Sequence, residues 1–331
     1  MRASTTWASA LAALLLAGPA GAQSGLDAKL AGRCEAAGLA AATGSLTLCR
    51  GAVASAQLLQ PELGLLLTGG NPVLGTASPI AKKFRGMPRF QLGGRIGFAW
   101  AKIPDVLVSP QDAAAAGTRS FVMAGPQLDL SVGVFDGVAL GSTAGGLGAI
   151  ELLGSVGTLL LPNGEGFERA ASGFGLGARV GILREGFTAP GISLTALYKR
   201  FGRVQYGGGL TELGLDMEAA AFRAGISKSF IAFGLAFTVA YDSYWSDIDL
   251  QVIVPSGMLQ AEGVATVIPR NDPIELHSDR WSAFLDVSYI VLFLNLTAEL
   301  GWQERAALTT SNGHDISSGK LFTAIGLRLT L

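Results

Sequence analysis

Charged residues, cysteines and histidines are scarce in this sequence of 331 residues, which contains 15% Asp, Glu, Lys and Arg, two cysteines and two histidines. So few cysteines exclude a disulfide-dense scaffold, and no Cys or His spacing matches a metal-ligand motif. The formal net charge of -1 gives no basis for nucleic-acid binding. We therefore expect no metal, no cofactor and no nucleic-acid partner.

Long hydrophobic runs are also missing, although 49% of the residues are hydrophobic. A transmembrane helix needs about 20 consecutive apolar residues, and the charge-free run from Leu63 to Ala81 is broken by glycines and prolines. The apolar residues are instead spread over many short segments that alternate with a period of two. This pattern is typical of a β-barrel, which satisfies every backbone hydrogen bond within lipid.

Residues 1–22 have the pattern of a secretory signal peptide. Arg2 supplies a positive charge, Ala8 to Leu16 form an apolar core, and Ala20 to Ala22 form a small-residue cleavage site. The pattern predicts a mature chain that crosses the inner membrane. No cysteine follows the cleavage site, so a lipid anchor is not expected.

The cysteines, Cys34 and Cys49, both lie in the mature chain. In an oxidising periplasm they are expected to form a disulfide; two inert, buried cysteines are the alternative. Around them, residues 24–60 place apolar side chains at helical spacings. We predict that segment 23–87 holds one or two short helices, joined by the disulfide, which lie beneath or inside the next domain as a plug.

A turn-dense stretch, GGNPVLG from Gly69 to Gly75, follows these helices. Its Asn-Pro pair in glycine-rich surroundings is similar to the N-terminal hatch region of the FadL-like hydrophobic-compound transporters. This resemblance implies transport of a small hydrophobic ligand. An ordinary turn is the alternative interpretation.

From Pro88 onward we count about ten segments of apolar–polar alternation, the mark of strands with two different environments. The last, GKLFTAIGLRLTL, ends on its apolar face at Leu331. In this it resembles the closing strand of bacterial outer-membrane β-barrel proteins, with a leucine in place of the usual terminal aromatic residue. We predict that residues 88–331 form an all-β fold, a transmembrane antiparallel β-barrel of about ten to twelve strands.

Two regions leave the strand assignment open. Between Thr211 and Lys228 the apolar positions change parity near Phe222, which predicts a bulge. Region 246–280 is either one very long loop or a further hairpin that pairs Ile248–Val254 with Gly263–Ile268.

The predicted connections also differ in length. If the first strand runs outward, the short links at Arg184 to Pro190, Ser227 to Ser229 and near Tyr289 all lie on one side. Bacterial barrels have short turns on their periplasmic side, so this side is predicted to face the periplasm.

Aromatic residues fall at strand ends that this topology places at the outer surface. They are Trp100, Tyr198, Tyr241, Trp245, Trp281 and Trp302, with Tyr244 beside them. Indole and phenol rings favour the membrane–water interface, so we predict an aromatic girdle at this rim. A soluble β-sandwich would instead bury its tryptophans within the strands.

Ionisable and a few aromatic residues occupy the positions predicted to face inward, and we expect them to line the lumen and a ligand path. They are Arg95, Asp129, Glu151, Arg179, Lys199, Asp216, Glu218, Asp242, Asp286, Glu299 and Arg328, with Phe284 and Phe322. Charged groups that cross hydrocarbon must face the interior and find partners there. A salt-bridged, packed interior that merely stabilises the barrel is the alternative.

The favoured function is passive, porin-like transport of a small molecule, with a hydrophobic compound as one option, across the outer membrane of a Gram-negative cell. The expected partners are outer-membrane lipid, the barrel-insertion machinery and the small hydrophobic ligand. One alternative is a structural or surface-interaction barrel that works through region 246–280. Another is a hydrolase at the rim, because His277 and His314 lie in predicted loops near aspartate and serine residues; solvated surface histidines are the simpler interpretation, and we expect no enzyme.

Overall fold

The computed structural model describes residues 32–37, 39, 43–80, 88–139, 145–167, 170–209, 211–254, 263–309 and 315–330. The predicted signal peptide and the residues His314 and Leu331 lie outside the described residues. Within the described part of the chain, no helix combines the length and the apolarity needed to cross a membrane.

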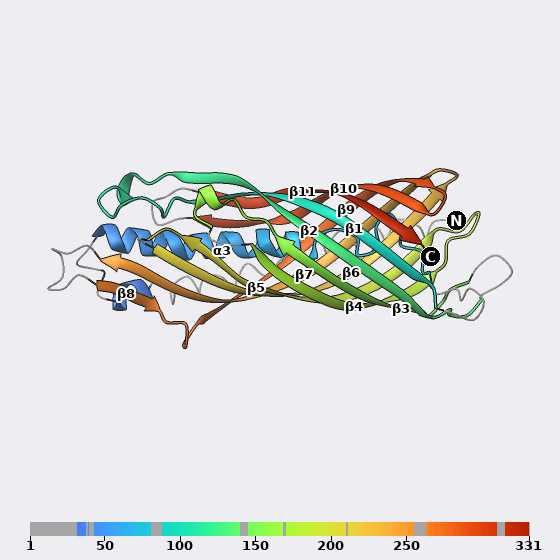
Figure 1. Cartoon of the computed structure of the whole chain (residues 1–331), viewed down its shortest axis with the longest axis horizontal. Helices are drawn as coiled ribbons and strands as arrows, with labels where there is room; N and C mark the ends of the chain where they lie inside the picture. Colours follow the sequence, from blue (N-terminus) through green and yellow to red (C-terminus); the bar gives the residue numbers. More distant parts are fainter. Residues whose placement is uncertain are drawn as a thin grey trace, which may run out of the picture.

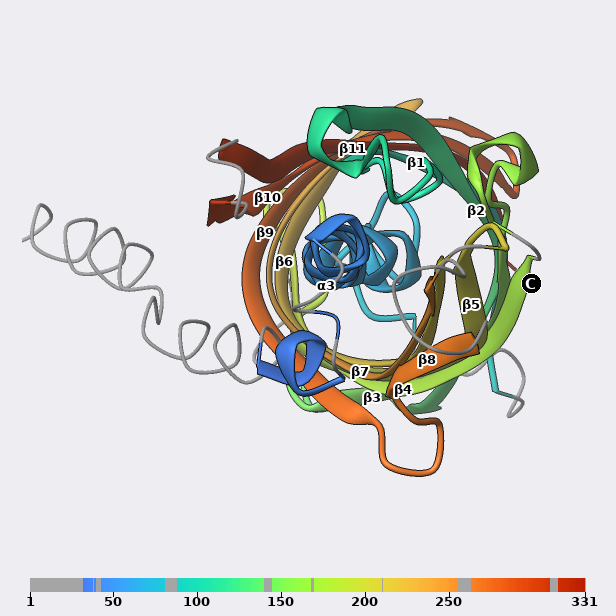
Figure 2. The ribbon, with the colours of Figure 1, turned by 90° about the vertical axis from the view of Figure 1, so that its left-hand side faces the viewer.

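The strands form a closed antiparallel β-barrel, which Figure 2 shows end-on. Strand β1 pairs with both β2 and β11, and the pairing of β6 with β7 closes the ring. The ten barrel strands are β1 (Phe90–Pro104), β2 (Thr118–Phe135), β3 (Ala149–Leu159), β4 (Ala171–Leu183), β5 (Gly191–Gly207), β6 (Thr211–Phe230), β7 (Phe233–Val254), β9 (Ile274–Val291), β10 (Leu294–Thr309) and β11 (Asp315–Thr330). The predicted barrel and its closing strand are confirmed.

Strand β8 (Gly263–Ile268) pairs with the C-terminal end of β7 and extends the barrel on one side (Figure 1). This is the hairpin that the sequence offered as an alternative for region 246–280. The interpretation as a single loop is wrong, because β7 continues to Val254 and β9 begins at Ile274. His277 therefore lies in a strand and not in a loop.

Helix α3 (Thr43–Thr68) runs along the inside of the barrel, parallel to its long axis (Figures 1 and 2). The prediction of one or two short helices is corrected here, because α3 alone has 26 residues. Residues 69–80 continue from its end as an irregular, almost fully buried segment, which we call the plug segment. The predicted plug is therefore inside the barrel rather than beneath it.

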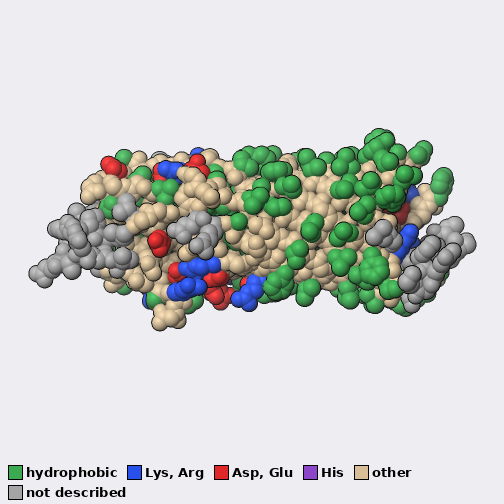
Figure 3. Space-filling view, viewed as in Figure 1, with side chains coloured by type: hydrophobic (Ala, Val, Ile, Leu, Met, Phe, Trp, Pro, Cys, Tyr) green, Lys and Arg blue, Asp and Glu red, His purple; other side chains and the backbone are tan. Residues whose placement is uncertain are grey.

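The barrel consists of two halves with opposite chemistry. In the half that contains the β6–β7 turn, side chains such as Phe222 point outward and Arg223 points inward. In the other half the same strand buries Leu215 and exposes Glu212. Figure 3 shows hydrophobic side chains over one half of the surface and charged side chains over the other. One half is thus apolar outside and polar inside, and the other is the reverse.

This inversion corrects the bulge predicted near Phe222. Strands β6 and β7 pair without a register shift from Thr211 to Phe230, so the parity of β6 never changes. The register shift lies in the neighbouring strand β5, between Phe201 and Val204. The change of apolar parity along β6 marks the boundary between the two halves.

Candidate functional site

The interior of the half with the polar outer face is a dry core around α3. Leu59, Leu63 and Leu66 on the helix share one buried hydrophobic cluster with wall residues such as Met123 and Leu215. Burial raises the pKa of the Tyr206 phenol, another member of this cluster, well above its ordinary value. This half of the lumen is closed by side-chain packing.

Cationic side chains from the wall bind the carboxyl end of α3. Lys199 Nζ donates to the Leu67 carbonyl at 2.7 Å, and Arg223 Nη2 donates to the Thr68 carbonyl. Arg223 also lies 3.6 Å from a carboxylate oxygen of Asp242. The last carbonyls of a helix have no partner within the helix and carry its negative dipole end, so these two cations cap the helix from the wall.

A second polar contact holds the side of the helix. Gln60 Nε2 donates to the Leu276 carbonyl at 2.9 Å, and Ser278 Oγ donates to Gln60 Oε1 at 3.0 Å. Tyr244 lies fully buried against the helix, and its hydroxyl accepts from Gln303 Nε2 at 2.8 Å. The prediction that Tyr244 belongs to the outer girdle is wrong, because its even position in β7 points inward.

Asn71 fixes the plug segment to the wall. Its backbone N–H donates to Glu299 Oε2 at 2.7 Å and its side-chain amide to Asp286 Oδ2 at 3.1 Å. The same amide donates to the Thr76 carbonyl at 3.2 Å, and Arg95 Nη1 donates to the Asn71 carbonyl at 3.3 Å. One residue of the Asn-Pro pair therefore connects the plug segment with β1, β9 and β10.

A buried ion pair holds the last residues of the plug segment. Arg179 Nη2 lies 2.6 Å from Glu151 Oε2, and both side chains are almost completely buried. Arg179 Nη1 also donates to the Thr76 carbonyl at 3.2 Å, and the Ile80 N–H donates to Glu151. The charged side chains of this ion pair on the barrel wall therefore also hydrogen-bond the backbone of the plug segment.

Most of the residues predicted to line the lumen do point inward and are buried. They are Arg95, Asp129, Glu151, Arg179, Lys199, Asp242, Asp286, Glu299, Arg328, Phe284 and Phe322. Their role along a ligand path stays a prediction, because α3 and the plug segment occupy the space between them. The alternation of apolar and polar residues along the strands does not indicate that α3 and the plug segment fill the lumen.

The lumen position predicted for Asp216 and Glu218 is wrong. Both lie on the outer face of β6, where Arg203 Nη1 is 3.2 Å from Asp216 Oδ2 and the Tyr198 hydroxyl donates to Glu218 Oε2 at 2.7 Å. The prediction assumed lipid outside the whole strand. In this half of the strand the charged residues face outward, and Leu213, Leu215 and Met217 face inward.

The outward aromatic residues gather near the boundary between the halves. Trp100, Tyr198 and Trp302 are each a little under half exposed, and Tyr241 contacts Trp281 with ring centroids 5.1 Å apart. Trp245 lies four residues beyond Tyr241, about 13 Å farther along β7, and stacks on His277. We therefore place Trp245 beyond the girdle, toward the C-terminal end of β7, and not within the girdle.

The neighbourhood of His277 lacks the order of a hydrolytic triad. The Asp279 carboxylate lies between the His277 imidazole and the Ser243 hydroxyl. His277 Nε2 is 3.2 Å from Asp279 Oδ2, and Ser243 Oγ donates to Asp279 Oδ1. A triad needs the imidazole between the nucleophile and the carboxylate. Among the described residues, no group of three or more His, Cys, Asp or Glu is placed to hold a metal ion.

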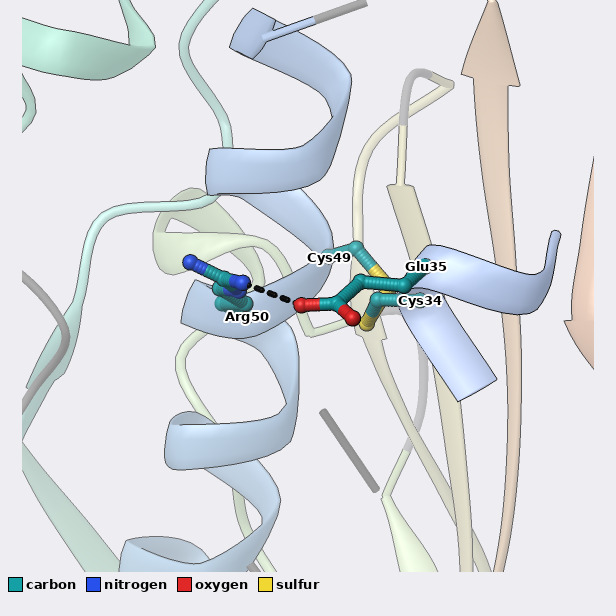
Figure 4. The surroundings of a disulfide bond; sticks show 4 residues. All are labelled: Cys34, Glu35, Cys49 and Arg50. Carbon is teal, nitrogen blue, oxygen red and sulfur yellow. Dashed lines mark hydrogen bonds and ion pairs between the residues drawn. A yellow bond between two sulfur atoms is a disulfide. The ribbon is translucent and has the colours of Figure 1, made fainter. Parts of the chain in front are cut away.

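The predicted disulfide between Cys34 and Cys49 is confirmed. It joins the short helical stretch at 32–36 to the first turns of α3, and beside it Arg50 Nη2 lies 2.7 Å from Glu35 Oε1 (Figure 4). A longer ion pair, Arg33 with Asp272 at 3.4 Å, connects this stretch to the link between β8 and β9. We call the disulfide-linked residues 32–37 and 43–50 the head.

The fold defines the class of this chain as a closed antiparallel β-barrel. No family model matches the sequence. No curated protein matches it either. Similar solved structures include the translocator domain of the autotransporter NalP from Neisseria meningitidis, with a TM-score of 0.36, 10% identity and coverage of 73% of this chain and 87% of that chain.

Two further similar structures have other activities in their names. The outer membrane protease OmpT from Escherichia coli has a TM-score of 0.32 and 11% identity over 74% of this chain and 96% of that one. The toluene transporter TodX from Pseudomonas putida has a TM-score of 0.29 and 9% identity over 80% of this chain and 94% of that one.

Proposed function

We propose that this protein is an outer-membrane barrel, closed by its own N-terminal residues, that acts as a surface-interaction module through its head and its β7–β8 hairpin. The observation that carries the proposal is the filled lumen. α3 fills one half with apolar contacts and the plug segment fills the other with hydrogen bonds. Among the described residues, α3 and the plug segment occupy the interior between the walls, and this favours a barrel that is closed at rest.

The outer surface supports the placement in a membrane. Large apolar side chains stand exposed on the outer face of one half, and they include Leu92, Leu128, Leu176, Phe237, Leu285, Leu296 and Ile325. Burial of this area in hydrocarbon is favourable at about 25 cal/mol per Å², whereas in water it is an aggregation hazard. The inward charges of the same half agree with an apolar solvent outside.

The lengths of the connections support the orientation. The tight turns after β6 and β9 lie at the end where β1 begins and β11 ends, and the head and β8 lie at the opposite end (Figure 1). Short turns mark the periplasmic side of bacterial barrels. This supports a proposed orientation in which the head and the hairpin face the cell surface, where a partner can reach them.

Surface accessibility tests the proposal. An epitope tag inserted between Arg270 and Asn271, in the link between β8 and β9, is expected to be detected on intact cells, while a tag in the 185–189 turn is expected to be detected only after permeabilisation. Detection of the second tag on intact cells, and not of the first, would contradict the proposed orientation.

A second candidate, transport after movement of the plug segment, is favoured by one observation. The plug segment contacts the wall mainly through polar groups, and several buried wall atoms near it, such as Asp286 Oδ1, Glu299 Oε1 and Arg328 Nη1, have no protein partner among the described residues. Water can replace polar contacts more readily than it can replace the packing around α3.

Planar-bilayer conductance distinguishes the two candidates. We expect the intact protein to be silent. If the second candidate is right, deletion of residues 24–80, which removes both α3 and the plug segment, opens a steady conductance; a barrel that stays silent after this deletion removes the transport hypothesis. Steady conductance by the intact protein would instead contradict the closed barrel of the first candidate.

A further inference from the structure

Four apolar side chains stand at the tips of three turns at the periplasmic end. Phe187 in the β4–β5 link and Ile231 in the β6–β7 turn are fully exposed, and Leu292 in the β9–β10 turn is 89% exposed. Phe293 follows Leu292 and is also exposed. We call Phe187, Ile231, Leu292 and Phe293 the turn tips.

Two of the turn tips occupy a backbone conformation that large side chains avoid. Ile231 has φ 52° and Leu292 has φ 56°, and among the described residues they are the only non-glycine residues with positive φ. Glycine, asparagine or aspartate is the usual choice in such tight hairpin turns, and a β-branched residue there is an outlier. Two separate turns thus keep an unfavourable residue type, which points to a function of the exposed side chain.

The three turns form one continuous surface. Strand β7 pairs with β9, so the β6–β7 and β9–β10 turns are neighbours, and the Phe233 and Tyr289 rings beside them are 5.2 Å apart. Lys228 Nζ donates to the carbonyls of Gly186, Phe187 and Ala189 at 2.6, 2.8 and 3.3 Å. The ammonium group is therefore satisfied by the turn beneath Phe187 and adds little free charge to the surface.

The exposed apolar side chains on the outer face of one half form what we call the apolar belt. The turn tips continue this belt without an interruption. On β9, outward Leu285, Val287, Tyr289 and Val291 lead from the girdle residue Trp281 to the turn. Ten residues of a strand tilted by about 40° rise about 25 Å, which equals the usual height of about 25 Å for the apolar band of a barrel. In Figure 3, hydrophobic side chains reach the very end of the molecule where Figure 1 draws these hairpins.

We propose that the turn tips are a lipid-binding surface, inserted among the acyl chains and glycerol groups of the periplasmic leaflet. This rests on the proposed placement in the outer membrane. Burial of the Ile231 and Leu292 side chains in lipid offsets the free-energy cost of their positive φ. Exposure of the same side chains to water would not offset it. The tips thereby anchor one side of the barrel at a fixed depth.

Fluorescence quenching of single cysteines tests this inference. Both native cysteines form a disulfide, so a new cysteine is the only thiol that a bimane label can modify. The variants are I231C and L292C, with F187C and F293C as substitutes at ordinary φ if the first two fail to fold. Leu285→Cys is the control inside the belt, and Glu212→Cys is the control on the water-exposed half of β6.

In vesicles of dibrominated phosphatidylcholine, we expect the tip labels to be quenched at least twofold more than the Glu212→Cys label, as the Leu285→Cys label is. Iodide in the buffer is expected to quench only the Glu212→Cys label strongly. If the belt label is quenched by the lipid but the tip labels respond to iodide, the turn tips face water and this inference is wrong. If the belt label also responds to iodide, the membrane placement itself fails.

Discussion

At the scale of single residues, Gly64 is a position where the backbone of α3 comes close to the barrel wall. A Cβ on this glycine would lie 2.4 Å from Cε1 of the Tyr244 ring. A glycine inside a helix costs about 1 kcal/mol relative to alanine, so propensity does not explain its presence. The tyrosine ring does, because it is fully buried and its hydroxyl is bonded to Gln303.

Gly64→Ala is therefore expected to destabilise the protein although alanine is the better helix former. Overpacking of a buried site costs about 1–3 kcal/mol, which should lower the midpoint of thermal unfolding in detergent. Gly154→Ala is the matched control, since nothing lies within 4 Å of its added Cβ. An unchanged midpoint for Gly64→Ala would show that α3 is not seated against Tyr244.

The Glu151–Arg179 pair gives a second prediction at this scale. Glu151→Ala leaves a buried guanidinium without its carboxylate and is expected to cost about 3–5 kcal/mol. The double variant Glu151→Leu/Arg179→Leu should cost much less, since it removes both charges. Urea unfolding in detergent measures both; equal losses in the two variants would mean that the pair contributes little coupling.

At the scale of elements, the disulfide determines how firmly residues 32–37 of the head hold to α3. It closes a separation of 15 residues, for which the chain-entropy model gives about 3 kcal/mol. The remaining contacts of the head include exposed ion pairs such as Arg33 with Asp272, and such pairs contribute about 0–1 kcal/mol each.

Cys34→Ser is therefore expected to loosen the head and leave the barrel folded. Limited proteolysis should cut the chain within residues 32–50 faster than in the unaltered protein, while the barrel keeps its heat-modifiable migration on a gel. Proteolysis at an unchanged rate would show that packing alone holds the head. A loss of the folded band would show that the barrel depends on it.

At the scale of the whole molecule, the inverted chemistry of the two halves predicts opposite responses to the same substitution. On the outer face of β6, Ile226→Arg places a charge midway between the girdle and the turn, which is expected to cost about 2–4 kcal/mol in a bilayer. Glu212→Arg, at the water-exposed end of the same strand, should change stability by less than about 0.5 kcal/mol. Chemical unfolding in vesicles compares the two.

The filled lumen is the other feature of the whole molecule. Strand alternation reports two environments, one on each side of the sheet, without saying which is wet. A polar inner face is equally consistent with water, a ligand or a hydrogen-bonded segment of the same chain. Here Asn71, Lys199 and Arg223 show that part of the polar wall is hydrogen-bonded to the helix and the plug segment of the same chain.

By itself the sequence determined the barrel strands outside region 246–280, the closing strand and the disulfide, because these depend on local alternation and on the compartment. The position of α3 inside the barrel, the inward face of Tyr244 and the outward face of Asp216 and Glu218 were decided only by the tertiary structure. The physical reason is that burial depends on both the solvent outside and the occupant inside. Along β6 the face that carries the apolar side chains changes midway, so one unbroken strand carries two opposite patterns.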